Sequence, residues 1–398
     1  MALLLLTSKT EKAKATLPSG RTDIFRMFLI STYAGQKIMS AKIFHHDIMN
    51  CTHEQVTGNH LYSGRTLGLT EKDDLIQLHP QLQPEWKSIV NHYARIGLPH
   101  THNVIWNVSP DNLKKHESYE LSVFFFGEDI HQVRPNAPWS QVVNYINSKN
   151  NFEILAEKLD MTTPETYCFC NKSAVVFDIE DLPFPCYLKA SVSVSGIGIY
   201  RCEDSKALKK ALADFDDNVP LQVQEEVKTD TFLNVQYRVN GQGLQRWAVT
   251  EQLLDGFAHK GNRFPSCHTP WASVDNMAQW LYNNGMQGTF AFDVGVVNEE
   301  DSIRYMPIEC NPRFNGASYP TGVAFKLGVT DWVHESFKTS HRHLADINLS
   351  GIEFDPKTKT GVVLVNWSPI FVGKLGVLIA GSPETQASLR QSLMQRLH

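Results

Sequence analysis

The chain has 398 residues, of which 42% are hydrophobic and 20% are charged. This composition is ordinary for a folded globular protein and argues against long disordered regions. At roughly 100 to 200 residues per domain, the length predicts two or three packed units. The net charge of -5 at pH 7 gives no overall attraction to nucleic acid or to anionic membranes, so neither is expected as a partner.

The cysteines and histidines give little sign of a zinc site. The seven cysteines are an odd number and are scattered along the chain, which favours reduced thiols in a cytoplasmic protein. None of the 16 histidines falls in a zincin or zinc-finger spacing. The close pairs are therefore expected at the surface, namely His45 and His46, His100 and His102, and His341 and His343.

The first 140 residues have the pattern of an open α/β layer. An apolar run at residues 2–6 is too short for a secretion signal or a membrane span and predicts a buried first strand. Strand-like runs at 104–106 and 121–126 alternate with polar helical stretches, and no glycine-rich phosphate motif occurs among them. The segment ends in a proline-bearing linker at 134–139.

The middle of the chain predicts a small α+β unit followed by longer strands. A helix from residue 147 carries Phe152, Leu155 and Leu159 on one stripe and stops before Pro164. Strands at 186–190 and 197–201 flank a loop of small residues, and Asp204 or Ser205 is the expected N-cap of the next helix. Further expected elements are a strand at 221–227, a hairpin of 234–239 with 245–250, a helix at 274–283, and tail strands at 362–367 and 374–379 before a last helix.

A hairpin of residues 289–297 and 304–310 carries two carboxylates. Period-2 alternation places Phe292 and Val294 on one face of the first strand and Asp293 on the other. On the second strand it places Met306, Ile308 and Cys310 on the apolar face and Glu309 opposite them. Asp293 is therefore expected to lie opposite Glu309, to within one residue of register.

Two opposed carboxylates repel each other, so a cation is expected between them. Asp293 and Glu309, with the amide oxygen of Asn311, would form an all-oxygen site suited to Mg²⁺. Arg313 follows directly and would offer a guanidinium fork for phosphate. The alternative is that both carboxylates lie on an open, solvated face of the sheet.

Residues 309–316, Glu-Cys-Asn-Pro-Arg-Phe-Asn-Gly, together with residues 285–293, resemble the metal-binding signature of ATP-grasp enzymes. Other elements of that family occur upstream in the right order, so that the resemblance covers roughly residues 147–325. It implies that Asp293, Glu309 and Asn311 bind Mg²⁺, with Mn²⁺ as an alternative ion, and that Arg313 is the chief catalytic residue.

The same resemblance implies an ATP site. Lys149, just before a helix, would contact the nucleotide phosphates, and Lys189 would reach the α-phosphate and the adenine region. Residues 222–227 resemble the hinge strand whose backbone binds adenine, and Asp230, followed by Thr231, stands where the family normally has the acid that binds the ribose. The remaining cofactor-binding residues that the resemblance implies are Ser195, Gly196 and Gly198 in the phosphate loop and Gln224, Glu225, Glu226 and Val227 in the hinge.

The fold that the resemblance implies combines α/β and α+β parts. An N-terminal open α/β domain, the pre-ATP-grasp domain, would occupy residues 1–140, and a two-lobed ATP-grasp domain residues 141–345. The lid lobe would span about 155–227, and residues 346–398 would close the structure, as in biotin-carboxylase-like members.

The implied activity is that of an ATP-dependent carboxylate–amine ligase. It would form an amide or peptide bond through an acyl phosphate and release ADP and phosphate. The partners would be a small-molecule carboxylate and a small-molecule amine, with Glu251, Asn262 and Ser318 as candidate contacts, and a homodimer is compatible with the sequence. Alternatives are a kinase or carboxylase-like enzyme on the same fold, or a nucleotide-binding regulatory protein without catalysis.

Overall fold

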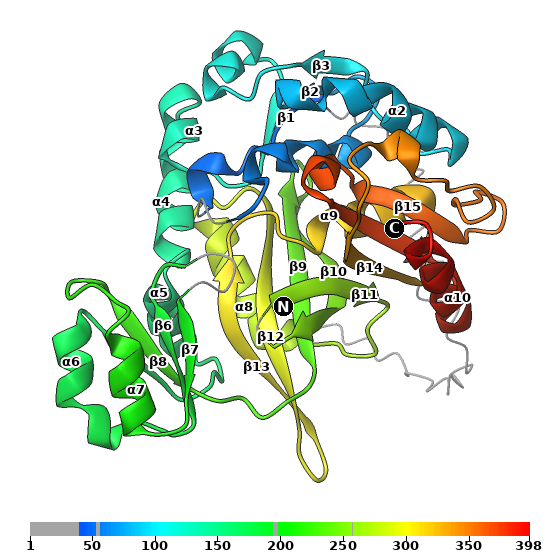
Figure 1. Cartoon of the computed structure of the whole chain (residues 1–398). Helices are drawn as coiled ribbons and strands as arrows, with labels where there is room; N and C mark the ends of the chain where they lie inside the picture. Colours follow the sequence, from blue (N-terminus) through cyan, green and yellow to red (C-terminus); the bar gives the residue numbers. More distant parts are fainter. Residues whose placement is uncertain (1–39, 53–55, 194–197, 257) are drawn as a thin grey trace, which may run out of the picture. The chain divides into compact units, whose positions relative to one another are not determined.

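A computed structural model describes residues 40–52, 56–193, 198–256 and 258–398 (Figure 1). The expected strand at 2–6 and the loop residues Ser195 and Gly196 lie outside the described residues. Residues 41–398 form one unit. No helix in the described ranges is long and apolar enough to cross a membrane.

The first sheet has four parallel strands, as the open α/β pattern predicted. They are β1 (Lys42–His45), β2 (Leu75–Gln77), β3 (Asn103–Ile105) and β4 (Glu120–Val123), in the order β3-β2-β1-β4. The connections include the 3-10 helices η2 (Asn59–Leu69) and η4 (Pro110–His116) and the helix α2 (Trp86–Arg95). Because β1 pairs with β2 on one side and with β4 on the other, the winding of the sheet reverses between β1 and β4.

The second sheet has four antiparallel strands in the order β5-β8-β6-β7. They are β5 (Thr166–Phe169), β6 (Cys186–Ala190), β7 (Ile199–Cys202) and β8 (Leu221–Glu225), and they share an apolar core with α6 (Lys172–Phe177) and α7 (Ser205–Leu212). Helix α5 (Lys149–Lys158) precedes this sheet. Asp204 is the N-cap of α7, since its carboxylate accepts the backbone N–H of Ala207, and this confirms the predicted helix start.

The third sheet has eight strands in the order β13-β12-β9-β10-β11-β14-β16-β15 (Figure 1). It includes both predicted hairpins and the tail strands, so the tail continues the sheet that carries the carboxylates. The predicted division into domains remains a prediction. The strands are β9 (Phe232–Asn240), β10 (Gly243–Asp255), β11 (Ala258–Phe264), β12 (Gly288–Asn298), β13 (Ile303–Asn311), β14 (Trp332–Lys338), β15 (Gly361–Asn366) and β16 (Lys374–Ala380), and the helices that follow strands are α8 (Trp271–Asn283), α9 (Ser318–Leu327) and α10 (Pro383–Met394).

The register of the carboxylate hairpin agrees with the prediction, because Asp293 pairs directly with Glu309. The predicted alternation beyond that pair is wrong. After the pair of Asp293 and Glu309, Val294 pairs with Pro307, and Ile308 has no partner. Because of this bulge, the β13 residues before Ile308 point to the opposite face from the predicted one. Tyr305, rather than Met306, therefore packs against the core on the side of Phe292.

Two histidines expected at the surface are buried, and that expectation was wrong. His45 is 5% exposed and His46 is fully buried. The ring nitrogens of His46 lie 2.9 Å from the Tyr319 hydroxyl and 3.1 Å from the Ser122 hydroxyl, so its polar atoms are satisfied without water. Burial lowers the pKa of His46 well below its usual range, which keeps the ring neutral.

Close backbone approach between β11 and β14 gives a stability prediction at Gly261. A Cβ atom there would lie 1.8 Å from the carbonyl oxygen of His334. We expect Gly261→Ala to lower the free energy of unfolding by at least the ~1–3 kcal/mol typical of overpacking, because backbone cannot move aside as a side chain can. Urea unfolding would measure the loss. Gly241→Ala is the matched control, since a Cβ there has no neighbour within 4 Å, and equal stability of the two variants would contradict the prediction.

Candidate active site

Asp293 is held at the centre of an amide network on the third sheet. Its Oδ1 accepts hydrogen bonds from Asn234 Nδ2 and Gln252 Nε2, each at 2.8 Å, and its Oδ2 accepts one from Asn311 Nδ2 at 2.9 Å. The donors come from β9, β10 and β13, so the carboxylate is fixed by three neighbouring strands. Asn234 and Gln252 were not predicted as site residues. Asn234 can be identified because it pairs with Asp293 across β9 and β12. Recognising this pair requires knowledge of the strand order.

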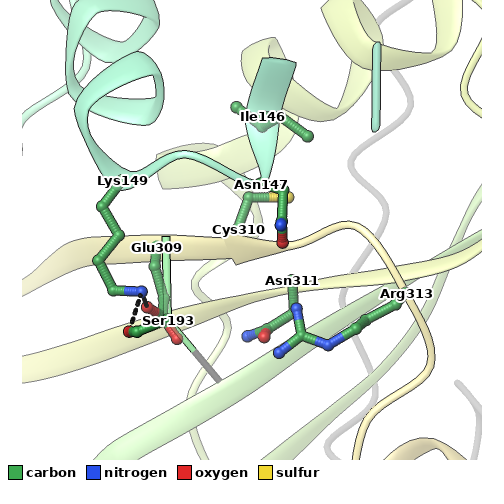
Figure 2. A pocket seen from close by; sticks show the side chains of 8 residues that line it. All are labelled: Ile146, Asn147, Lys149, Ser193, Glu309, Cys310, Asn311 and Arg313. Atoms are coloured by element: carbon green, nitrogen blue, oxygen red, sulfur yellow. Dashed lines mark hydrogen bonds and ion pairs between the residues drawn. The ribbon is translucent and has the colours of Figure 1, made fainter. Parts of the chain in front are cut away.

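Glu309 forms an ion pair with Lys149, whose Nζ lies 2.9 Å from Oε2. Lys149 Nζ also lies 3.2 Å from the Ser193 hydroxyl (Figure 2). The backbone N–H of Lys149 donates to the Ser191 carbonyl at 2.7 Å, which ties the start of α5 to the loop after β6. The cation expected beside the two carboxylates is thus partly supplied by a lysine of the chain itself.

Lys189 is 5% exposed and lies in the same charged cluster. Its Nζ donates to Gln224 Oε1 at 2.7 Å, and Gln224 in turn donates to the Thr166 hydroxyl at 3.0 Å. Burial, opposed by the charge of Glu309 and reinforced by that of Lys149, lowers the pKa of Lys189 to about 8. Two predicted cofactor residues of the second sheet, Lys189 and Gln224, are therefore in direct contact.

The two carboxylates differ in their protonation behaviour. Burial and the negative charge of Glu309 raise the pKa of Asp293 to about 7. Burial opposes ionisation of Glu309 too, but the positive charges of Lys149, Lys189 and Arg313 outweigh it and hold the pKa of Glu309 at about 2. The site therefore keeps Glu309 ionised and has capacity for a further positive charge beside Asp293.

A small pocket with a volume of about 10 Å³, the space of roughly one water molecule, lies beside Glu309 and Lys149 (Figure 2). Arg313 lies beside Asn311 in this pocket, so the predicted catalytic residue and two of the three predicted metal ligands are together. Asn147 and Ser193 also line it and were not predicted as site residues, although residue 147 begins the predicted helix and Ser193 lies in the predicted loop of small residues. The lining residues are Ile146, Asn147, Lys149, Ser193, Glu309, Cys310, Asn311 and Arg313.

The expected hinge residues lie at the end of β8 and directly after it. Glu226 does not present a free carboxylate, because it binds Arg201 through contacts of 2.5 and 2.7 Å and accepts from the Tyr187 hydroxyl. The backbone N–H groups of Glu225 and Glu226 donate to the carbonyls of Glu165 and Pro185. Asp230 is exposed, Val227 is half-buried, and Gly198 has a φ of +74° that favours glycine.

The three candidate substrate contacts have different surroundings. Ser318 donates to Asn315 Oδ1 at 3.2 Å, and Asn315 Nδ2 lies 3.3 Å from Asn234 Oδ1, so Ser318 is linked to the amide network around Asp293. Asn262 is buried and donates to the Thr250 hydroxyl at 3.1 Å. Glu251 is paired with Arg263 at 2.6 Å.

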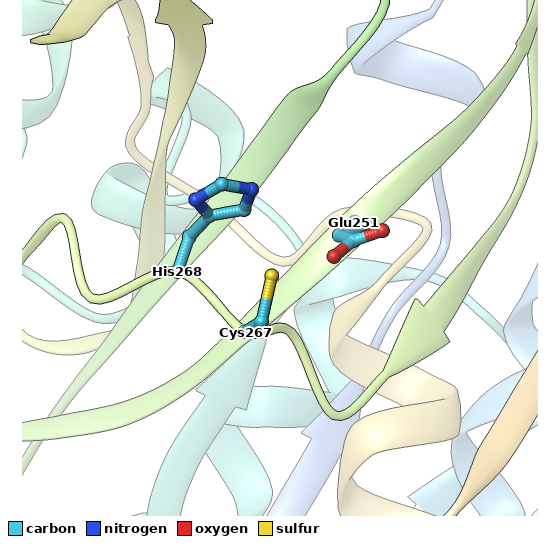
Figure 3. A group of neighbouring side chains, drawn as sticks. All are labelled: Glu251, Cys267 and His268. Carbon is cyan, nitrogen blue, oxygen red and sulfur yellow. The ribbon is translucent and has the colours of Figure 1, made fainter. Parts of the chain in front are cut away.

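Glu251 also belongs to a group of metal-ligating side chains with Cys267 and His268 (Figure 3). One ligand atom of each lies within 4.8 Å of the other two. Both oxygens of Glu251 are already engaged, one by Arg263 and the other by the Ser266 hydroxyl at 3.2 Å. The negative charge of Glu251 is therefore already paired with a cation of the chain in this arrangement.

Comparisons with solved structures agree with this architecture. An N5-carboxyaminoimidazole ribonucleotide synthetase in complex with ADP is 14% identical, with a TM-score of 0.55 over 90% of this chain and 97% of the other. The synthetase from Staphylococcus aureus with ADP is 10% identical, with a TM-score of 0.57 over 90% and 98%. Biotin carboxylase from Campylobacter jejuni with an ATP analogue is 10% identical, with a TM-score of 0.59 over 90% and 92%.

No protein-family profile and no curated protein sequence matches the chain. At such low identity the likeness concerns the fold alone. The coverage of nearly the whole of each related structure shows that the similarity is not confined to one motif. The chain therefore has the fold of these synthetases and of biotin carboxylase, as the resemblance to ATP-grasp enzymes implied.

Proposed function

We propose that the protein is an ATP-dependent ligase that joins a carboxylate to an amine. The observation that carries this proposal is the convergence of Lys149, Glu309 and Arg313 on one pocket, from segments far apart in the chain. Asp293 pairs with Glu309 across the hairpin, and Lys189 belongs to the same charged cluster. Two buried lysines beside a pair of carboxylates match the charges of a nucleotide phosphate chain and its metal ion. The proteins of similar fold are described in complexes with ADP or an ATP analogue, which supports the nucleotide.

The donor set fits Mg²⁺. All three predicted ligands offer oxygen, and Asn311 directs its Nδ2 to Asp293, so that its Oδ1 is free of that contact. Glu309 engages Lys149 through Oε2 and keeps Oε1 for a further partner. An ion bound there would neutralise charge on the nucleotide phosphates.

The residues of the chain would act mainly by positioning and by charge. Lys149 would exchange part of its contact with Glu309 for a phosphate oxygen, and Lys189 would contact a phosphate nearer the nucleoside. Arg313 would stabilise charge on the transferring group. The second sheet would form a lid that excludes water, since an acyl phosphate is readily hydrolysed.

The proposed reaction has two steps. An oxygen of the substrate carboxylate bonds to the γ-phosphorus of ATP, and the bond from that phosphorus to the β–γ bridging oxygen breaks, releasing ADP. The amine nitrogen then bonds to the acyl carbon, the bond from that carbon to the phosphate oxygen breaks, and the nitrogen loses a proton. The products are an amide, ADP and phosphate.

Release of ADP and phosphate tests this proposal. ATP and Mg²⁺ would be incubated with amino acids, short peptides and other small carboxylates, singly and in pairs, with mass detection of the products. Stimulation by a pair with a condensation product is the expected result. A phosphorylated product from one compound would instead support a kinase, and incorporation of bicarbonate would support a carboxylase-like enzyme, for which the fold of biotin carboxylase is the favouring observation. Nucleotide binding without turnover across the panel would support a regulatory protein.

A further inference from the structure

A second pocket lies at the carboxyl ends of β1 and β4, where the winding of the parallel sheet reverses. Ligands of open α/β sheets bind at this kind of switch point, because the connections diverge there and leave a crevice. The pocket has a volume of about 210 Å³, which is enough for a small ligand but below the range typical of drug-sized ones. Its wall contains His45 from the end of β1, Asp47 and Cys51 from the segment after β1, and Glu128 and Asp129 from the segment after β4.

The hydrogen-bond network fixes the tautomer of His45. Gln77 Nε2 donates to the Ser109 carbonyl at 3.0 Å, and a carbonyl can only accept, so the other amide atom, Oε1, faces His45. Because Oε1 lies 2.7 Å from His45 Nδ1 and also can only accept, Nδ1 must carry the proton. Burial lowers the pKa of His45 and keeps the ring neutral. Nε2 is therefore an unprotonated acceptor.

Asp47 supplies a second acceptor without a donor. Its Oδ1 accepts the Met49 N–H at 3.1 Å, whereas its Oδ2 is buried and has no hydrogen-bond partner among the residues the structure describes. Asp129 is already satisfied by the Ile130 N–H and the Asn50 amide, each at 2.9 Å. Asp47 has no ion pair among the described residues, so the pocket is complementary to a ligand that brings a positive charge to Asp47 and donates to His45 Nε2.

The charge of the pocket selects the kind of ligand. Asp47, Glu128 and Asp129 line it, and no lysine or arginine is among its described lining residues. A phosphate or carboxylate group would be repelled, whereas a protonated amine would be attracted and could donate several hydrogen bonds.

The pocket also lies close to the candidate active site. The backbone N–H of Phe314 donates to the Phe124 carbonyl at 3.1 Å, so the residue after Arg313 is hydrogen-bonded to the residue before Phe125, which lines the switch-point pocket. Arg313 lines the pocket beside Glu309. A ligand in the switch-point pocket would therefore be near the residue proposed to stabilise the transferring group.

We infer that this switch-point pocket binds the amine substrate, through donation from its nitrogen to His45 Nε2 and attraction of its positive charge to Asp47. That the amine is a substrate rests on the proposed ligase function. The binding of a cationic amine can be measured without turnover. It assigns the carboxylate and the amine to two different pockets of one chain.

Calorimetric titration of the full chain without nucleotide tests the inference. The probes are lysine, ornithine, putrescine and agmatine, with succinate and inorganic phosphate as anions. We expect at least one amine to bind, neither anion to compete with it, and Asp47→Asn to weaken amine binding at least tenfold. Glu117→Gln makes the same change in net charge at an exposed site outside the pocket and should bind as the wild type does.

ADP binding, measured in parallel, distinguishes a failure of the pocket assignment from a failure of the proposed ATP-dependent function. Unchanged ADP affinity in Asp47→Asn would show that the variant is folded. If it is not, His45→Gln gives a second test, because it removes the ring acceptor and should also weaken amine binding. Wild-type protein that binds ADP but no amine, or that binds an anion in competition with amines, would overturn the pocket assignment alone. Wild-type protein that binds no nucleotide would contradict the proposed function.

Discussion

Glu309→Gln is expected to lower Mg²⁺-dependent ADP release by about two to three orders of magnitude and to leave the fold intact. Removal of one electrostatic contact to a developing charge typically has an effect of this size. The amide has the shape of the carboxylate, so β13 keeps its pairing with β12. It cannot, however, supply the negative charge that Lys149 and a metal ion share. The initial rate of ADP release at saturating Mg²⁺ measures the loss, and circular dichroism checks the fold.

Glu299→Gln is the matched control for this variant. Glu299 lies in the turn of the same hairpin and is paired with Arg304 at 3.1 Å, with 44% of its side chain exposed. Exposed pairs of this kind contribute little to stability, so its rate should equal that of the wild type. A wild-type rate in Glu309→Gln would show that the metal ion is held elsewhere.

The hairpin of β12 and β13 could be predicted from the sequence because its pattern is local. Strand alternation and a short polar turn fix which residues can face each other, and the register follows from the turn. The same logic predicted the β9–β10 hairpin and the start of α7 at its cap. These features depend on residues within about one turn or one strand pair of each other.

The rest of the site depends mostly on contacts between distant segments. The bulge beside Asp293 changes the faces of β13, and its one local sign is Pro307, next to the skipped Ile308. The amides of Asn234 and Gln252 reach Asp293 only because β9 lies between β12 and β10. The pairing of Lys149 with Glu309 joins the start of one helix to a distant strand. The family resemblance could assign some of these residues to one site, but it could not predict the hydrogen bonds and the ion pair between them.

Burial of His45 and His46 is a further case of tertiary context. A polar pair at the end of a strand is typical of a surface, and here the Gln77, Ser122 and Tyr319 side chains supply the partners that make burial tolerable. Those partners come from β2, β4 and α9. The same contacts fix the proton of His45 on Nδ1, so that Nε2 is an acceptor in the switch-point pocket. The sequence interpretation was therefore wrong at a residue that is a candidate functional residue.

Lys189→Met is expected to weaken ADP binding by about tenfold to a hundredfold, since hydrogen bonds to charged groups contribute about 1.5–3 kcal/mol. The wild type should also show a pH dependence that the variant lacks. The pKa of Lys189 is lowered to about 8, chiefly by burial, so the free protein holds its ammonium below that pH and loses it above. Phosphate binding favours the charged form, and therefore ADP binding above pH 8 must take up a proton.

The affinity of the wild-type protein for ADP should therefore be constant below about pH 8. Above that pH it should fall by up to tenfold per pH unit, until the pH reaches the pKa of Lys189 in the ADP complex. Titrations of ADP at constant Mg²⁺ between pH 7.5 and 9.5 would measure this. Lys189→Arg keeps the charge over the whole range and should bind with little pH dependence. If Lys189→Met retained both the affinity and the slope of the wild type, Lys189 would be a buried structural cation satisfied by Gln224 alone, and the nucleotide phosphates would have to lie nearer Lys149.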